Sequence, residues 1–350
     1  MKRTDMNNEI ALKLALAMAV IVSLAGCGAT NSSSGNGTGG GTTTPTAAKS
    51  IYVIQNSQTF PVTPGSVLQL STATSGNISP EKTIIAPAGN DFQGLATDAK
   101  GNLYVAANSQ TTSMLLEYAP GANGTATPIG SIPSNTTTMM SAPDGLAISP
   151  SGQIVVGEDG GAVATYSADA SGTVAPEYYI AGNLTKLNAA ESVAASSSGI
   201  YVFNPGNLNG PPILIFSPTA TGNVAPIGSL GGSLTGITGF IGGIATDSSG
   251  NFYVTNTDIN AGSVLVFAPT ATGNVAPART IAGTSTELGA LGGIQVDAVG
   301  NIYVISTSGH GENPTVLEFA ASASGNAAPT LTITSSAWTF PDNYISLAVY

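Results

Sequence analysis

The chain has 350 residues, of which 42% are apolar and only 8% are charged, and its formal net charge is −11. Eight Lys and Arg against 19 Asp and Glu cannot form the clustered basic surface that nucleic-acid binding requires, so that class of function is excluded. One cysteine allows neither an intramolecular disulfide nor a thiolate metal cluster. The abundance of Gly (44) and Pro (21) favours an all-β fold with many tight turns.

Residues 1–26 predict an export signal. Basic residues precede an apolar run at 14–24, which is too short to span a bilayer as a helix and is typical of a signal peptide. The run ends in Leu-Ala-Gly-Cys at 24–27, which resembles the bacterial lipobox. This resemblance implies cleavage before Cys27, lipid attachment to its thiol, and a membrane as partner through that anchor. Gly28 in place of Asp further implies an outer-membrane or cell-surface lipoprotein if the source is Gram-negative.

Residues 27–49 carry the lipidated cysteine and a run rich in Gly, Ser and Thr with no hydrophobic period. Such a composition cannot bury apolar surface, so it predicts a disordered tether with a reach on the order of 25 Å. The folded body is therefore expected over residues 50–350.

A unit of about 50 residues recurs along that body, a period typical of propellers and solenoids. Its clearest copy begins at Gly243 and holds four short apolar runs separated by Gly, Asn, Asp or Pro. Four strands per unit predict one blade of a β-propeller. A connector such as Pro-Thr-Ala-Thr-Gly-Asn-Val-Ala-Pro, at 218–226 and again at 269–277, follows the third strand. Its Gly and Pro are expected to form a turn before the fourth strand.

The two ends of the body complete the count. Residues 51–54 match a second strand with no first strand before it, and residues 346–350 match a first strand with no second strand after it. The sequence therefore predicts a six-bladed β-propeller of four-stranded antiparallel blades, closed by pairing of the N- and C-terminal strands.

The motif Asp-x-x-Gly-Asn-x-Tyr-Val, at 98–105, 247–254 and 297–304, resembles that of NHL-repeat propellers and of the related SMP-30 (gluconolactonase-like) propellers. The resemblance covers the whole predicted body and implies the six-bladed fold. It does not imply one activity, because these folds host lactonases, lyases, sensors and binding platforms.

Several residues that recur in the repeat are expected to be structural. Asp98, Asp247 and Asp297 should accept hydrogen bonds within their own turns rather than bind metal. His310, in a Gly-rich loop without a nucleophile elbow, predicts no catalytic triad. Five tyrosines at one repeat position should pack between blades rather than form a sugar-binding ring. They are Tyr52, Tyr104, Tyr201, Tyr253 and Tyr303.

The position just before the first strand breaks the repeat. It holds Gln93, Asp144 and Glu191 in three consecutive blades, and Gly242 and Gly292 in two others. The innermost strand of a blade begins at the mouth of the central channel, so these three residues form a candidate ligand or metal site. The alternative is that Asp144 caps a turn and Glu191 is solvated at the rim.

The resemblance to the SMP-30 group gives one further reason to consider a metal there. Pro143-Asp144-Gly145 has the form of an element that carries an Asp metal ligand in that group, and Ca²⁺ takes several oxygen ligands. The sequence departs from the group because a full set of Glu, Asn and Asp ligands round the ring is missing, and the metal is left undetermined.

Asn108, Asn204 and Asn256 end second strands on the same face, where they are candidate contacts for a glycan or peptide. Capping of turns is their alternative role. Three functions remain open. The first is a cell-envelope binding or scaffold module for a protein, peptide or glycan; the second is a metal-dependent hydrolase or lyase of the SMP-30 kind; the third is a structural surface-layer component.

Overall fold

The computed structural model describes residues 50–56, 64–109, 111–205, 211–238, 240–258, 261–307, 314–336, 338 and 346–350. The predicted signal peptide, Cys27, the tether and His310 lie outside the described residues. Among the residues described, none of the helices has the length and hydrophobicity that a bilayer crossing requires.

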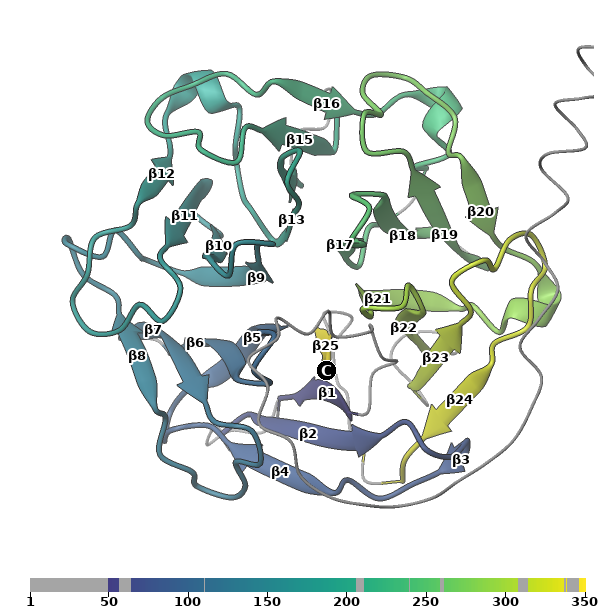
Figure 1. Ribbon diagram of the computed structural model, residues 1–350, viewed down its shortest axis with the longest axis horizontal. Helices are drawn as coiled ribbons and strands as arrows, with labels where there is room; N and C mark the ends of the chain where they lie inside the picture. The colour runs from purple at the N-terminus through teal and green to yellow at the C-terminus, as the bar shows by residue number, and fades with distance from the viewer. Residues whose placement is uncertain are drawn as a thin grey trace, which may run out of the picture. The chain divides into compact units, whose positions relative to one another are not determined.

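The described residues form six sheets set round a common centre, each with a core of four antiparallel strands (Figure 1). This arrangement confirms the predicted six-bladed β-propeller. Each run of apolar residues alternates with Gly-, Asn- or Asp-containing turns, so the chain passes outward from the innermost strand of a blade before it enters the next blade. Three short 3₁₀ helices follow the outer strands of three blades: η1 (Asn183–Thr185), η2 (Ser233–Thr235) and η3 (Thr284–Thr286).

We number the blades in chain order and give their strands from the innermost to the outermost. Blade 1 consists of β25 (Leu347–Val349), β1 (Ser50–Gln55), β2 (Ser66–Ser71) and β4 (Lys82–Ile85). Blade 2 consists of β5 (Asp91–Thr97), β6 (Leu103–Asn108), β7 (Ser113–Tyr118) and β8 (Gly130–Pro133). Blade 3 consists of β9 (Pro143–Ile148), β10 (Ile154–Glu158), β11 (Ala162–Tyr166) and β12 (Tyr178–Ile180).

The second half of the ring follows the same plan. Blade 4 consists of β13 (Ser192–Ala195), β14 (Ile200–Phe203), β15 (Ile213–Phe216) and β16 (Gly228–Leu230). Blade 5 consists of β17 (Ile244–Thr246), β18 (Phe252–Asp258), β19 (Ala261–Phe267) and β20 (Arg279–Ile281). Blade 6 consists of β21 (Ala290–Val296), β22 (Ile302–Thr307), β23 (Thr315–Phe319) and β24 (Leu331–Thr334), extended by the short parallel strand β3 (Gly76–Asn77).

Blade 1 contains both ends of the folded body, as the sequence predicts. In Figure 1 the yellow β25 lies beside the purple β1, and the two strands pair with Val53 opposite Leu347. Two further hydrogen bonds of 3.0 Å join the main chains of Ser50 and Tyr350. The last strand of the chain therefore closes the ring.

The hydrophobic core is divided among the six interfaces between neighbouring blades. Each of the six clusters of buried side chains draws residues from two adjacent blades. All five repeat tyrosines are buried in these clusters, which confirms their packing role. The carboxylate of Asp247 shows the role of the repeat aspartates: it accepts hydrogen bonds from the main chain of Ser249 and Asn251 and from the hydroxyl of Tyr253. Asp98 and Asp297 accept equivalent bonds in their own turns.

The connector after each third strand reaches back to the outer strand of the preceding blade, and we call this contact the rim clasp. In blade 5, Gly273 donates its N–H to the carbonyl of Ser229 in blade 4 at 2.6 Å. The neighbouring Asn274 accepts, at its Oδ1, a bond of 2.7 Å from the N–H of Leu234 in η2. The glycine has a φ of 78°, as the turn prediction requires. The sequence did not predict that this turn also holds two blades together.

Rim clasps recur all round the ring. Glycines of blades 2, 3, 4 and 6 donate equivalent main-chain bonds, and in blade 1 the clasp is the parallel pairing of β3 with β24. Asn223 and Asn326 accept from the first turns of η1 and η3 at 2.7 Å, as Asn274 does from η2. The outer strands, which would otherwise be open edges, are thus partly covered by the next blade.

Candidate functional site

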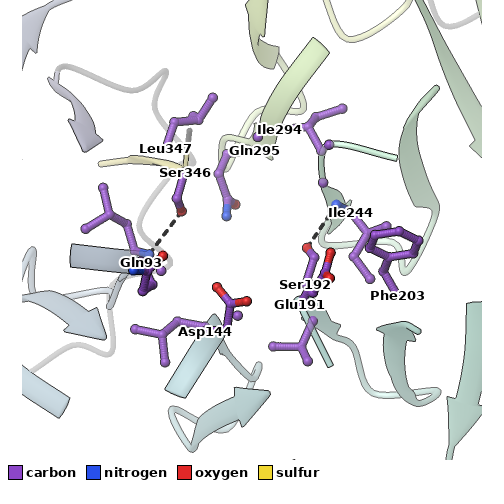
Figure 2. A pocket seen from close by; sticks show the side chains of 18 of the residues that line it. Gln93, Asp144, Glu191, Ser192, Phe203, Ile244, Ile294, Gln295, Ser346 and Leu347 are labelled. Carbon is purple, nitrogen blue, oxygen red and sulfur yellow. Dashed lines mark hydrogen bonds between the residues drawn. The ribbon is translucent and has the colours of Figure 1, made fainter. Parts of the chain in front are cut away.

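The candidate site lies at one end of the channel between the innermost strands. A cavity of about 70 Å³ opens there, and Gln93, Asp144 and Glu191 all line it. Figure 2 shows the side chains of Asp144, Glu191 and Gln295 arranged around this common space. The structure therefore brings together the three residues that the sequence selected, and we call this space the central cavity.

A β-bulge places the first of these side chains. In blade 2, Phe92 pairs with Ala107 and Leu95 pairs with Val105, so Gln93 and Gly94 together face one residue of β6. The extra residue bends the strand and turns Gln93 toward the channel. Blade 3 has the same irregularity at Asp144 and Gly145, between the pairs formed by Pro143 and Leu146.

The residue after Gln93 and the residue after Asp144 are both glycine, because the inner strands of neighbouring blades approach one another closely there. A Cβ built on Gly94 would lie 2.0 Å from the carbonyl oxygen of Asp144 in the next blade. A Cβ on Gly145 would lie 2.9 Å from the Cα of Ser192. Two hydrogen bonds fix the same level of the channel: Ser346 Oγ accepts from Leu95 N at 3.1 Å, and Ser192 Oγ accepts from Ile244 N at 3.3 Å (Figure 2).

The electrostatics of the cavity are negative. Burial, together with the nearby carboxylates of Glu191 and Asp159, raises the pKa of Asp144 to about 7. Burial and Asp159 also raise the pKa of Glu191 above its ordinary value. In the described part of the chain the one salt bridge is the exposed pair Lys100–Asp169, so no described Lys or Arg forms a salt bridge with either cavity acid.

The donor set at the cavity suits a hard cation only in part. Asp144, Glu191, Gln93 and Gln295 offer side-chain oxygens, which are the ligands that Ca²⁺ prefers. However, the residues that the structure describes contain no group of three or more His, Cys, Asp or Glu side chains placed to hold a metal. Two carboxylates and two amides would leave much of a Ca²⁺ shell to other ligands.

The three candidate asparagines make contacts within the chain. Asn204 accepts from the N–H groups of Asn188 and Ala189 and donates to the carbonyl of Lys186, which braces the loop before β13. Asn256 accepts from Thr238 N at 3.1 Å and so holds the loop before β17.

Asn108 is used differently. Its Nδ2 donates to the carbonyl of Pro143 in blade 3 at 2.9 Å, whereas its buried Oδ1 has no hydrogen-bond partner in the structure. It thus links blade 2 to the strand that carries Asp144.

Sequence reasoning missed several residues of this region. Gln295 lines both the central cavity and a second cavity of about 200 Å³ further along the channel. Glu158, 1% exposed, accepts two hydrogen bonds from Ser141 at the position that Asn204 and Asn256 hold in their blades. Burial raises its pKa. The repeat alignment could have found Glu158, because it shares their column, but Gln295 is identified only by the direction of its side chain.

No family model matches the chain, and no curated protein matches its sequence. Solved structures do resemble it. A protein of unknown function from Bacteroides caccae superposes with a TM-score of 0.58 at 10% identity, covering 87% of this chain and 99% of the other. A luciferin-regenerating enzyme (TM-score 0.45, 12% identity, 81% and 96% covered) and the Dos1 propeller (TM-score 0.41, 10% identity, 81% and 72% covered) also match. The first likeness shows a shared fold and nothing finer, and the six sheets of the structure identify the chain as a six-bladed β-propeller.

Proposed function

We propose that this protein is a binding module of the cell envelope that holds a positively charged group of a protein, peptide or glycan in its central cavity. The observation that carries this proposal is the presence of two half-buried carboxylates, Asp144 and Glu191, in one small cavity. Partial burial raises the pKa of both groups, so their charged forms are destabilised unless a cation or hydrogen-bond donors compensate them. A cationic group of a ligand would supply that compensation.

The size of the cavity supports capture of one group rather than of a whole ligand. Sites that enclose a drug-sized ligand measure about 300–1,000 Å³, whereas this cavity measures about 70 Å³. A primary ammonium or guanidinium fits such a space, and the rest of the ligand would then lie over the face of the propeller. Of the three candidate asparagines, Asn204 and Asn256 are 1% and 4% exposed and serve inside the chain, so Asn108, which is partly exposed, is the one offered for a contact on that face.

The envelope location rests on the N-terminal sequence. The signal-peptide pattern over residues 1–26 and the lipobox ending at Cys27 support export and lipid attachment. The Gly/Ser/Thr-rich residues 28–49 would keep the propeller at a distance from the headgroups, free to meet a ligand.

A metal-dependent hydrolase or lyase is the second candidate. The oxygen donors of Asp144, Glu191 and Gln93 support it, and a bound Ca²⁺ would supply Lewis-acid polarisation of a substrate oxygen. The incomplete donor set and the missing third acidic ligand in the described residues place it second.

Calorimetric titration of the full chain separates these functions. The probes are n-butylammonium, its neutral analogue n-butanol, and CaCl₂, each added to the wild type and to the Asp144→Asn/Glu191→Gln double variant. The proposal expects heat with n-butylammonium but not with n-butanol, and a loss of at least tenfold in affinity in the double variant. Binding of Ca²⁺ alone would favour the metal enzyme, and the absence of heat with either cation would overturn both.

A further inference from the structure

Blade 3 lacks the tyrosine that the other five blades place at one position of their second strand. The equivalent residue there is Val155, which is fully buried on the side that faces blade 4. Every other blade fills this space with a phenol ring. Replacement of such a ring by an isopropyl group leaves room between two blades unless the neighbours close in.

The neighbours cover Val155 itself but leave part of this space unfilled. A cavity of about 160 Å³ lies between blades 3 and 4, with Val155 and Thr165 on one side and Ala195, Ile200 and Pro218 on the other. Exposed residues such as Ser197 line its edge, so it can be reached from solvent. An apolar cavity of about 150 Å³ engineered in another protein binds benzene, so this space is the right size for one six-membered ring.

A polar side chain without a hydrogen-bond partner borders this space, whose lining also includes Ser149, Ser151, Gln153, Ser196 and Ser197. Thr165 lies directly across from Val155 in the pairing of β10 with β11 and is 2% exposed. Its hydroxyl is buried and has no hydrogen-bond partner in the structure. A buried hydroxyl without a partner destabilises the folded state, and a ligand with its own hydroxyl would satisfy it.

The other blades show how a phenol would sit here. In blade 2, Tyr104 donates to the side chain of Glu117, which lies directly across from it as Thr165 lies across from Val155. In blade 4, the hydroxyl of Tyr201 donates to the carbonyl of Pro269 at 3.2 Å. Pro269 begins the connector of blade 5, and Pro218 is the equivalent residue in the connector of blade 4. Pro218 lines the cavity beside Val155.

The ring itself would also find its usual neighbour. The Tyr201 ring stacks on Phe252 of the next blade, with centroids 4.5 Å apart. Ile200 of blade 4 is the residue equivalent to Phe252 of blade 5. It lines the cavity next to Val155, as Phe252 lies next to Tyr201. A ring placed above Val155 would therefore pack on Ile200 and direct its hydroxyl toward Pro218 or Thr165.

We propose that the space between blades 3 and 4 is a binding site for a small monocyclic phenol, which occupies the place of the missing tyrosine. The ring would be held by Val155, Ile200 and Pro218, and its hydroxyl would bond to Thr165 or to the carbonyl of Pro218. This site shares no lining residue with the central cavity, so the proposal does not depend on the proposed function.

The test is calorimetric titration of the full chain with p-cresol and with toluene, which has the same ring without the hydroxyl. The wild type should bind p-cresol about tenfold more tightly than toluene. Val155→Tyr, which supplies the ring from the chain itself, should abolish binding of both and raise the melting temperature. Thr165→Val should weaken p-cresol about fivefold and leave toluene within a factor of two.

If Val155→Tyr does not fold, a variant that creates a second site of the same kind still tests the proposal. Tyr201→Val opens the same kind of space between blades 4 and 5, and it should raise the stoichiometry of p-cresol from one to two. The proposal is overturned if the wild type binds neither compound, if Val155→Tyr still binds p-cresol, or if toluene binds as tightly as p-cresol.

Discussion

The rim and the centre of the propeller differ in how closely equivalent positions resemble one another from blade to blade. At the rim, the connectors of different blades make the same contacts: Gly222, Gly273 and Gly325 each donate a main-chain bond of 2.6–2.7 Å to the preceding blade. At the centre, equivalent positions differ, with Gln93, Asp144 and Glu191 in three blades and glycine in two others. The rim joins neighbouring blades by one contact that recurs round the ring. The inner strands also join blades, as the bond from Leu95 N to Ser346 Oγ shows, but the polar residues that precede them differ from blade to blade, and these departures from the repeat mark where specific chemistry can be built.

The same contrast predicts opposite effects of mutation. Residues that conform to the repeat should stabilise the fold, whereas the acids that break it should cost stability, because partial burial and nearby carboxylates raise the free energy of their charged forms. Three experiments test this contrast, beginning with the largest expected effect.

Removal of residues 346–350 should abolish cooperative folding. The truncation deletes β25, leaves β1 with an unpaired edge, and takes Leu347 and Ala348 out of two of the hydrophobic clusters. Such a loss exceeds the usual stability of a domain, about 5–15 kcal/mol in total, once the edge and both clusters open. Circular dichroism during heating measures it, and a truncated protein with the melting transition of the full chain would refute the importance of closure.

Asp144→Asn should stabilise the protein at high pH, by about 2–4 kcal/mol at pH 8. The folded-state pKa of about 7 lies above the ordinary value, so the folded protein keeps a proton that the unfolded chain releases. Stability in the wild type is therefore complete below about pH 4 and declines as the pH rises through 7.

Urea unfolding at several pH values checks this expectation. The difference between the Asp144→Asn variant and the wild type should grow from pH 5 to pH 8. The raised pKa of Glu191 adds a decline of the same sign to both proteins, so it serves as an internal background. A variant that loses stability at pH 8 would mean that the carboxylate of Asp144 stabilises the fold.

Asn274→Ala should destabilise the protein by about 1 kcal/mol, because it removes the bond from Leu234 N in one rim clasp. Asn223→Ala and Asn326→Ala are matched controls, since each removes the same bond from a different blade. Urea unfolding should give three similar losses. Losses that differ by more than about 1 kcal/mol would show that the clasps are not equivalent and would weaken the contrast with the centre.

The fold could be read from the sequence because its signals are local and repeated. The incomplete strands at 51–54 and 346–350 predicted closure, and the structure pairs them. The role of Asp247 was also predictable, since its hydrogen bonds stay within the turn that follows it. The grouping of Gln93, Asp144 and Glu191 was also predicted, from the position that they share in the repeat, and all three line one cavity.

What the sequence did not reveal depends on contacts between blades. Asn274 looks like a turn residue in its own connector, but its partner Leu234 lies 40 residues earlier in the preceding blade. The void beside Val155 depends on how far blade 4 approaches, which no local pattern encodes. Gln295 follows a shift of register in β21, between Leu291 and Ile294, and the sequence does not show that its side chain faces the channel.

The close approach of the inner strands has a consequence for what can pass or bind at the centre. At Gly94 and Gly242 the adjacent backbone leaves no room for even a methyl group, with carbonyl oxygens 2.0 and 2.1 Å from where a Cβ would stand. Main-chain atoms, which cannot rotate aside, therefore fix the aperture there. Substitution of one polar side chain for another can change the chemistry of this opening, but the opening cannot widen unless the inner strands move apart.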